Sequence, residues 1–288
     1  MVNAGLILEG GGMRGVYTAG VLDFFLDKDL EFKEVYGVSA GSCHACSYLS
    51  KQRGRALAIS IDYLKDPRYC GVRSLIRTGD LFGVKMCYDT IPNELNPYDY
   101  KTFNRFQGNF YAVMTDCETG EACYHRIKNM RKDIWAVRAS SSLPLVSRMV
   151  GVRGHLYLDG GIADSIPVKQ SEKNGNLKNV VVLTRDKDYR KGPNQAMRLI
   201  RKLYRRYPNL VAGMEDRHIR YNETLDYLAE GEKEGTIFVI RPSRKVEVGR
   251  IEKNKEKLME LYQEGYEDAA AVWEELSRFL DLTDETKK

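Results

Sequence analysis

The stretch GLILEGGGMRG (residues 5–15) decides the fold that the sequence predicts. Its apolar start indicates a short buried strand over Leu6 to Leu8, and glycines spaced as GxGxxG follow at once, at Gly10, Gly12 and Gly15. A glycine-rich turn directly after a strand exposes main-chain N–H groups that can bind an anionic group. Two interpretations are open at this point: a dinucleotide site, or N–H donors aimed at another anion.

The segments that follow extend this stretch into an alternation of helix and strand. Val16 to Leu26 has the pattern of a helix, and Glu34 to Val38 that of a second buried strand leading into another helix. Further strands are expected in a hairpin around Glu118 to Gly120 and over residues 155–159, 179–184 and 236–240. Because such connections are right-handed and favour parallel pairing, the sequence predicts an α/β fold: a mostly parallel central sheet with helices on both faces, plus a mainly helical C-terminal part.

Composition limits the class of protein. With 288 residues, 43% of them hydrophobic, the chain can bury a substantial core. No apolar run approaches the roughly 18 residues that span a bilayer, and the first residues lack the pattern of a secretory signal. Six scattered cysteines are expected to be reduced thiols, so a cytoplasmic protein is expected.

Cys43 and Cys46 form a CxxC pair. A tetrahedral zinc site needs two further ligands at suitable spacing, and Cys117 and Cys123 lie six residues apart with no histidine beside Cys117. We therefore interpret the pair as small buried residues of a helix and expect no metal or other cofactor. Zinc binding or redox chemistry is the alternative.

A dinucleotide site also needs an acidic residue at the end of the second strand, about 20 residues beyond the glycines. That strand ends in YGVSAGS (residues 36–42), and no acid closes it. Instead Gly37, Ser39 and Gly41 form GxSxG, the pattern of a serine on a tight strand-to-helix turn. The turn alone fits a nucleophilic Ser39 and a helix N-cap equally well.

The glycine loop over Gly10 to Gly12 favours the nucleophile. Acyl transfer needs main-chain donors aimed at the developing oxyanion, and a run of glycines lets N–H groups approach it without a side chain in the way. Adjacent parallel strands would bring this loop beside Ser39. The sequence therefore predicts that the N–H groups serve an oxyanion rather than a pyrophosphate.

Three ordered segments carry a family resemblance: EGGGMRG (residues 9–15), GVSAGS (37–42) and DGGIADSIPV (159–168). They resemble the motifs of the patatin-like phospholipases of the bacterial cytosolic type. The resemblance covers roughly residues 5–170, including ASSSLPL at 139–145, and this part is expected to form the catalytic core. Residues 171–288 are expected to complete the sheet and to add basic and amphipathic helices.

The resemblance implies a serine lipid acyl hydrolase with a catalytic dyad, in which Ser39 is the nucleophile and Asp159 the base. It assigns the oxyanion hole and substrate contacts to Gly10, Gly11, Gly12 and Arg14. The remaining motif positions are Gly15, Gly37, Gly41, Gly160 and Gly161. Asp164 and Ser165 stand where many relatives have asparagine, so the support of Asp159 is expected to differ. The expected partner is a phospholipid or other acyl ester, not a nucleic acid.

A Ser–Asp–His triad of the α/β-hydrolase type is the alternative mechanism, and only His218 follows Asp159 in the required order. It lies in a charged helical stretch, and the Ser39 turn comes earlier in the chain than the several leading strands of that fold allow. The other histidines, expected to be structural or to point away from Ser39, are His44, His125 and His155. A non-catalytic nucleotide- or lipid-binding protein is the remaining alternative class.

Residues 185–207 concentrate the basic charge of the chain, with nine Lys or Arg against two Asp in a protein of net charge +5. Apolar side chains recur there at helical spacing, at Met197, Ile200, Leu203, Tyr204 and Tyr207. One interpretation is a helix docked on the core with a solvated basic face. A second is a membrane-surface helix that brings the enzyme to anionic lipid at the inner membrane face, and nucleic-acid binding is the remaining alternative for this segment.

Overall fold

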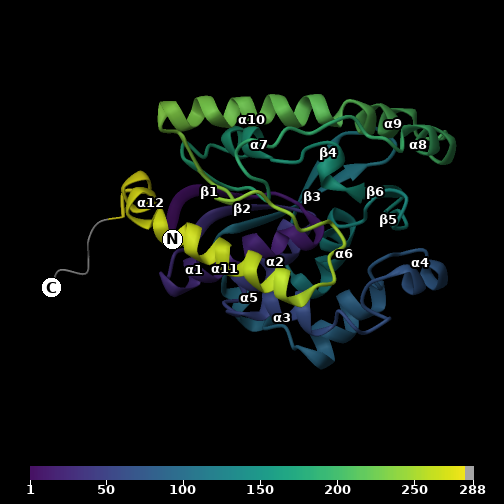
Figure 1. Cartoon of the computed structure of the whole chain (residues 1–288), viewed down its shortest axis with the longest axis horizontal. Coiled ribbons are helices and arrows are strands. Elements are labelled where there is room, and N and C mark those ends of the chain that lie inside the picture. The colour runs from purple at the N-terminus through teal and green to yellow at the C-terminus, as the bar shows by residue number, and fades with distance from the viewer. Residues whose placement is uncertain (283–288) are drawn as a thin grey trace.

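The computed structural model describes residues 1–282 and builds them around one eight-stranded sheet (Figure 1). The strands are β1 (Val2–Leu8), β2 (Phe32–Val38), β3 (Asn109–Asp116), β4 (Ala122–Arg126), β5 (Val150–Val152), β6 (His155–Asp159), β7 (Asn179–Val182) and β8 (Ile237–Ile240). Their order is β5-β6-β3-β2-β1-β7-β8, with β4 paired to β3. The pairings from β3 through β2, β1 and β7 to β8 are parallel, and those of β4, β5 and β6 are antiparallel. The predicted α/β fold with a mostly parallel sheet is confirmed.

Helices cover both faces of the sheet (Figure 1). One face carries α1 (Val16–Asp27), α2 (Ala40–Leu49), α3 (Arg55–Asp62), α5 (Tyr100–Arg105), α6 (Met130–Ser140) and α11 (Lys255–Ala271). The other carries α7 (Val168–Lys173) and α10 (Arg217–Glu234), with α8 (Met197–Leu203) and α9 (Pro208–Glu215) beyond one end. The remaining helices are α4 (Val72–Thr78), the π-helix η2 (Met86–Leu95) and α12 (Trp273–Phe279). No helix in residues 1–282 is both long and apolar enough to cross a membrane.

The central strands are buried on both faces, which explains their nearly continuous apolar sequences. In β1, Leu6 and Leu8 join the large hydrophobic cluster formed with α1, α2, α6 and α11. Ile7, which lies between them, points to the other face and packs in a cluster that includes Val181 of β7 and Leu228 of α10. Successive side chains of one strand thus serve two separate cores.

The C-terminal part of the chain packs directly on its beginning. β7 and β8 extend the sheet from β1, and α11 lies along α1. A Cβ atom on Gly20 of α1 would lie 2.0 Å from the carbonyl oxygen of Tyr262, and one on Gly265 of α11 would lie 2.1 Å from that of Tyr17. The two backbones touch because each helix presents a glycine to the other, so this contact admits no side chain.

Within residues 185–207 a helix forms where the helical spacing of apolar residues begins, at Met197, but it ends at Leu203, before the predicted stripe reaches Tyr207. Residues 185–194 contain no helix, and α8 covers only Met197–Leu203. Gly192 and Pro193 interrupt the helical pattern, since proline cannot continue a helix and disfavours the helical conformation of the residue before it. Of the expected apolar stripe, Ile200 and Tyr204 are buried, whereas Leu203 is 60% exposed.

Candidate active site

Ser39 occupies a strained turn between β2 and α2. Its backbone has φ 54° and ψ −121°, a region that costs a residue with a side chain on the order of 1–3 kcal/mol. The turn is as tight as the sequence predicted: a Cβ atom on Gly37 would lie 2.5 Å from Ser42 Cα, and one on Gly41 would lie 2.3 Å from the carbonyl oxygen of Leu8. Although Ser39 stands at the N-cap position, its side chain makes no capping hydrogen bond.

Three consecutive serines at the end of α6 hold Ser39 and Asp159 in place. The Ser39 N–H donates to Ser140 Oγ at 2.9 Å, and Ser141 Oγ donates to the Ser39 carbonyl at 3.2 Å. The carbonyl of Ser142 accepts the N–H of Asp159 at 2.9 Å. The sequence analysis includes ASSSLPL in the family resemblance but gives these serines no role. The signal that could have found them is a run of three serines at the end of a helix.

The register of β3 brings Asp159 beside Ser39. Val38, the last residue of β2, pairs with Val113, and Asp159, the last residue of β6, pairs with the next residue, Met114. Because β4 occupies the other edge of β3 along the same stretch, β6 continues the edge that β2 leaves. Two segments 120 residues apart in the sequence therefore end at one point.

The Asp159 carboxyl is buried and only partly satisfied. Its Oδ1 accepts the N–H of Gly161 at 2.9 Å, whereas its buried Oδ2 has no hydrogen-bond partner within residues 1–282. Burial raises the pKa of Asp159, and the charge of Arg217, the nearby Ser39 hydroxyl and the Gly161 N–H partly oppose this rise. The hydroxyl influences the carboxyl without meeting the full geometry of a hydrogen bond. A carboxylate with a raised pKa is a stronger base than an exposed one.

The turn after Asp159 requires its two glycines. A Cβ atom on Gly160 would lie 2.1 Å from the carbonyl oxygen of Val113, and one on Gly161 would lie 2.7 Å from Arg217 Nη2. Ser165 Oγ donates to the Gly161 carbonyl at 2.7 Å and so supports the short helix η3 (Gly160–Ile162). Asp164 instead accepts the Tyr124 hydroxyl at 2.7 Å.

The glycine loop after β1 lies against Ser39, as the parallel pairing of β1 with β2 predicts. A Cβ atom on Gly10 would lie 2.7 Å from Ser39 Cβ. The N–H groups of Gly10, Gly11 and Gly12 form no hydrogen bond within the described chain, and the next N–H, that of Met13, donates to the carbonyl of Arg250 at 3.1 Å. Three consecutive N–H donors are thus available beside Ser39.

The four histidines lie apart from the Ser39–Asp159 pair. His218 Nδ1 lies 3.0 Å from the carbonyl oxygen of Glu215, and His155 lies 3.0 Å from Asp116. His125 lies 3.6 Å from Asp133. His44 is buried against Gly15, and burial lowers its pKa to about 4. Within residues 1–282 no histidine hydrogen-bonds to Ser39 or Asp159, so the triad alternative has no candidate third member.

An apolar cavity of about 170 Å³ opens on one side of Ser39. Met13 lines it together with side chains of α2, α3, η2 and α6 and of the loops between them, including Ile59, Tyr69, Phe82, Tyr88, Tyr98, Met130, Ile134 and Val137. Cys43 and Cys46 belong to this wall as free thiols. No three His, Cys, Asp or Glu side chains of the described residues gather as a metal-binding group.

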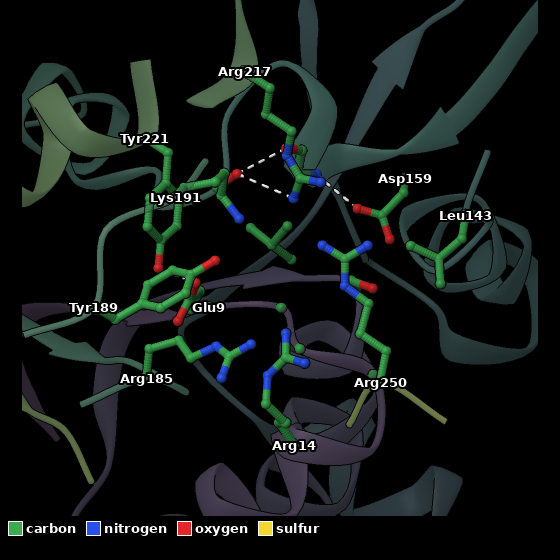
Figure 2. A pocket seen from close by; sticks show the side chains of 17 residues that line it. Glu9, Arg14, Leu143, Asp159, Arg185, Tyr189, Lys191, Arg217, Tyr221 and Arg250 are labelled. Carbon is green, nitrogen blue, oxygen red and sulfur yellow. Dashed lines mark hydrogen bonds between the residues drawn. The ribbon is translucent and has the colours of Figure 1, made fainter. Parts of the chain in front are cut away.

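A second, smaller cavity of about 30 Å³ lies on the other side of Ser39 and reaches Asp159 and the glycine loop. Figure 2 shows five cationic side chains around it, and we call this set the cationic pocket: Arg14, Arg185, Lys191, Arg217 and Arg250. Of these, the sequence analysis assigns Arg14 to the site and counts Arg185 and Lys191 only as part of the basic segment 185–207. It missed Arg217 and Arg250, because nothing in their local sequence distinguishes them from other surface cations.

Fold and site together define an α/β protein with a serine on a strand-to-helix turn, a buried aspartate beside it and a glycine loop over both. The family model described as patatin-like phospholipase matches residues 6–171, more than half of the chain. The chain therefore belongs to the patatin-like phospholipase family, and the predicted resemblance is confirmed. A second model, a domain of unknown function (DUF6363), matches residues 207–281.

Two curated relatives and one solved structure are among the proteins that this chain resembles. The chain is 31% identical over 183 residues to the uncharacterized protein YjjU of Escherichia coli (strain K12), a match that covers 62% of this chain and 51% of YjjU. It is 28% identical over 178 residues to the lysophospholipase nte1 of Aspergillus niger, covering 58% of this chain and 11% of that protein. VipD from Legionella pneumophila is similar with a TM-score of 0.45 and 12% identity, over 96% of this chain and 66% of VipD. The chain thus spans about half or less of the length of these curated relatives.

Proposed function

We propose that this protein hydrolyses acyl esters of lipids through a covalent acyl-enzyme on Ser39. The observation that carries the proposal is the meeting of three unsatisfied features at one point. Ser39 stands on a strained turn without a capping role, Asp159 Oδ2 is buried without a partner in residues 1–282, and the N–H groups of the glycine loop are unused. Acyl transfer needs a nucleophile, a base and oxyanion donors in this arrangement.

In the first half of the proposed reaction, Ser39 Oγ attacks the ester carbonyl carbon and Asp159 Oδ2 accepts the hydroxyl proton. The carbonyl oxygen becomes an oxyanion that accepts hydrogen bonds from the N–H groups of Gly10 to Gly12, with the charge of Arg14 nearby. One such donor is worth about 3 kcal/mol of barrier in a comparable site. The intermediate then expels the alcohol, which takes the proton from Asp159.

In the second half, a water molecule attacks the acyl group on Ser39 and gives a proton to Asp159. The same N–H groups stabilise the second oxyanion, and Asp159 returns the proton to Ser39 Oγ as the fatty acid leaves. The enzyme ends as it began. The scheme uses only side chains and main-chain groups of this chain, without a metal or nucleotide.

The apolar cavity supports a lipid acyl chain as the acid half of the substrate. It begins at Ser39 and Gly12 and runs between aromatic and aliphatic side chains of α3, η2 and α6. Burying an acyl chain there removes apolar surface from water, about 0.8 kcal/mol for each methylene group. The relative named lysophospholipase agrees with such a substrate.

We also propose that residues 185–207 contact an anionic lipid surface. On α8, Leu199 and Leu203 are 49% and 60% exposed, and the basic residues Arg198 and Lys202 on the same helix are also exposed. Exposed apolar side chains among cations fit the boundary of an anionic bilayer.

The proposed nucleophile is tested by comparing two serines of the same turn and helix. Ser39→Ala is expected to abolish hydrolysis of p-nitrophenyl acyl esters. Ser42→Ala is the matched control, because Ser42 is fully buried three residues later, lines neither cavity, and has an Oγ without a partner among residues 1–282. Equal loss in both variants, or full turnover in Ser39→Ala, would refute the assignment.

A further inference from the structure

The cationic pocket is more than the proposed hydrolysis requires. Arg14 belongs to the glycine motif, but the other four cations come from residues 185–250, which follow the patatin-like segment in the sequence. Arg185 and Lys191 come from the loop after β7, Arg217 from the start of α10 and Arg250 from the loop before α11. All four line the cavity beside Ser39 (Figure 2). An acyl transfer at Ser39 needs one base and a set of N–H donors, so these charges call for another role.

The five cations of the cationic pocket form no ion pair among the described residues, and only two carboxylates, Glu9 and Asp159, line the pocket with them. Within residues 1–282 none of its five cations lies within 4.0 Å of a carboxylate oxygen. The Nε atoms of Arg14, Arg185 and Arg217 are buried without a hydrogen-bond partner in the same residues. Burying an unpaired charge is costly unless a partner compensates it.

The nearest carboxylate outside the dyad, Glu9, is already committed to neutral donors. Its Oε2 accepts the N–H of Thr184 at 2.7 Å and the Thr184 hydroxyl at 3.0 Å, and its Oε1 accepts the Tyr221 hydroxyl at 2.7 Å. Tyr221 in turn carries Lys191 over its ring, with Nζ 4.1 Å from the centroid. The pocket therefore holds its cations in place without pairing them.

Mutual repulsion in the pocket appears in the acid–base properties of its members. Burial and the neighbouring charges of Arg217 and Arg250 lower the pKa of Lys191 to about 7. Burial, Arg185 and Arg250 lower the pKa of Arg14 to about 10. A bound anion would relieve both effects, because an opposite charge favours the protonated form of each cation.

We propose that the cationic pocket binds a phosphomonoester group on the alcohol half of the substrate, so that the enzyme selects acyl esters of a small phosphorylated alcohol. This inference rests on the proposed function, since it assigns the second half of the same ester. Ser39, Gly12 and Leu143 line both cavities, so an ester carbonyl at Ser39 has an apolar wall on one side and the cations on the other.

The size and charge of the pocket favour this group over bulkier ones. Its free volume of about 30 Å³ suits a compact group of few atoms. A phosphomonoester carries a charge of about −1.5 to −2 near pH 7 and three acceptor oxygens, which match several cations at once. A choline head group would bring a further positive charge to a pocket whose five cations would repel it.

The test compares three esters with one acyl chain: 1-palmitoyl-glycerol 3-phosphate, 1-palmitoyl-glycerol and 1-palmitoyl-glycerophosphocholine. The wild-type kcat/KM is expected to be at least roughly tenfold higher for the phosphomonoester than for either other ester. Lys191→Gln and, separately, Arg250→Gln are expected to reduce this ratio roughly tenfold. The second variant guards against misfolding, because Arg250 is an exposed residue.

Arg190→Gln is the matched control for Lys191→Gln. Arg190 is the preceding residue, is exposed, and pairs with Asp226 outside the pocket. It is expected to keep the wild-type ratio. Equal rates on the three esters, or equal effects of Arg190→Gln and Lys191→Gln, would overturn the inference while leaving hydrolysis intact.

Inorganic phosphate separates the substrate group from a free anion. If phosphate inhibits hydrolysis of 1-palmitoyl-glycerol and Lys191→Gln relieves the inhibition, but no preference for the phosphomonoester exists, the pocket holds a free anion and the inference is wrong. If no ester is hydrolysed and Ser39 does not react with any acyl donor, the proposed function fails as well.

Discussion

The two cavities that meet at Ser39 differ in the polarity of their walls. The apolar cavity is built from segments between Gly12 and Leu143, with aromatic rings, aliphatic side chains and thiols in its wall. The cationic pocket lies toward Asp159, and four of its five cations come from residues 185–250. The apolar cavity therefore favours apolar groups, which water solvates poorly, whereas the cationic pocket favours anions, which water solvates strongly.

This difference suggests how one site can hold both halves of an amphiphilic ester. The shared residues Gly12, Ser39 and Leu143 form the boundary, and the reacting carbonyl would lie on it. Changes on either side should therefore alter selection of one half of the substrate, whereas changes at the boundary should stop the chemistry.

The largest effect is expected at Asp159, which lines the cationic pocket beside the boundary residue Ser39. Asp159→Asn removes the proposed base, and its kcat on p-nitrophenyl esters is expected to fall by about 10³-fold or more. His218→Ala is expected to stay within a few-fold of wild type, because His218 contacts the Glu215 carbonyl instead of the dyad. A histidine variant as impaired as the aspartate variant would restore the triad mechanism.

On the apolar side, Ala56→Phe fills part of the cavity from α3. We expect kcat/KM for a long-chain p-nitrophenyl ester to fall roughly 10- to 100-fold relative to the acetate ester, because the acyl chain loses its space. Ala58→Phe on the same helix is the control, since Ala58 does not line the cavity. If both variants change chain-length preference equally, the acyl chain binds elsewhere.

Lipid-surface contact is expected to depend on exposed cations outside both cavities. Reversing four of them to Glu should weaken sedimentation with anionic vesicles by more than roughly tenfold, since each contributes on the order of 1 kcal/mol. The four are Arg198, Lys202, Arg205 and Arg206, and Arg201 is left in place because it pairs with Glu215. The control reverses the exposed Lys173, Lys233, Lys255 and Lys257. Equal sedimentation of the two variants would remove this proposal.

The smallest expected effect links the cationic pocket to the dyad. The charge of Arg217 lowers the pKa of Asp159, so its loss in Arg217→Gln raises that pKa further. Asp159 must be deprotonated to act as a base, so the acid limb of kcat/KM is expected to move to higher pH. Arg190→Gln should leave the limb in place. A shift to lower pH would contradict the assignment of the base.

Much of this site is predictable from local sequence, because tight backbone geometry leaves a local trace. The two strands, the GxSxG turn at Ser39 and the glycine loop lie within residues 5–42, and parallel pairing of consecutive strands places them together. The position of Asp159 follows less directly, since its approach depends on the antiparallel pairing of β6 with β3. The family resemblance identifies Asp159 in the sequence, because the glycines Gly160 and Gly161 follow it in a recognisable motif.

The walls of both cavities lie beyond such reasoning. Residues 55–105 fold into the short helices α3, α4, η2 and α5, and they form much of the apolar wall. The cations Arg185 and Lys191 belong to a segment that resembles a surface helix, and only the loop before α8 turns them inward. Long-range packing decides where these side chains lie. The sequence therefore predicts that this segment is basic, but it does not predict that two of its cations line the cavity beside Ser39.

The most direct test of the central claim is to find which atom becomes acylated or phosphonylated. Wild-type protein treated with a fluorophosphonate that carries an alkyl chain should show, by peptide mass spectrometry, one adduct on Ser39, and Ser39→Ala should show none. Asp159→Asn should react much more slowly at the same position. An adduct on another residue, or equal labelling of Ser39→Ala, would contradict an acyl-enzyme on Ser39 between the two cavities.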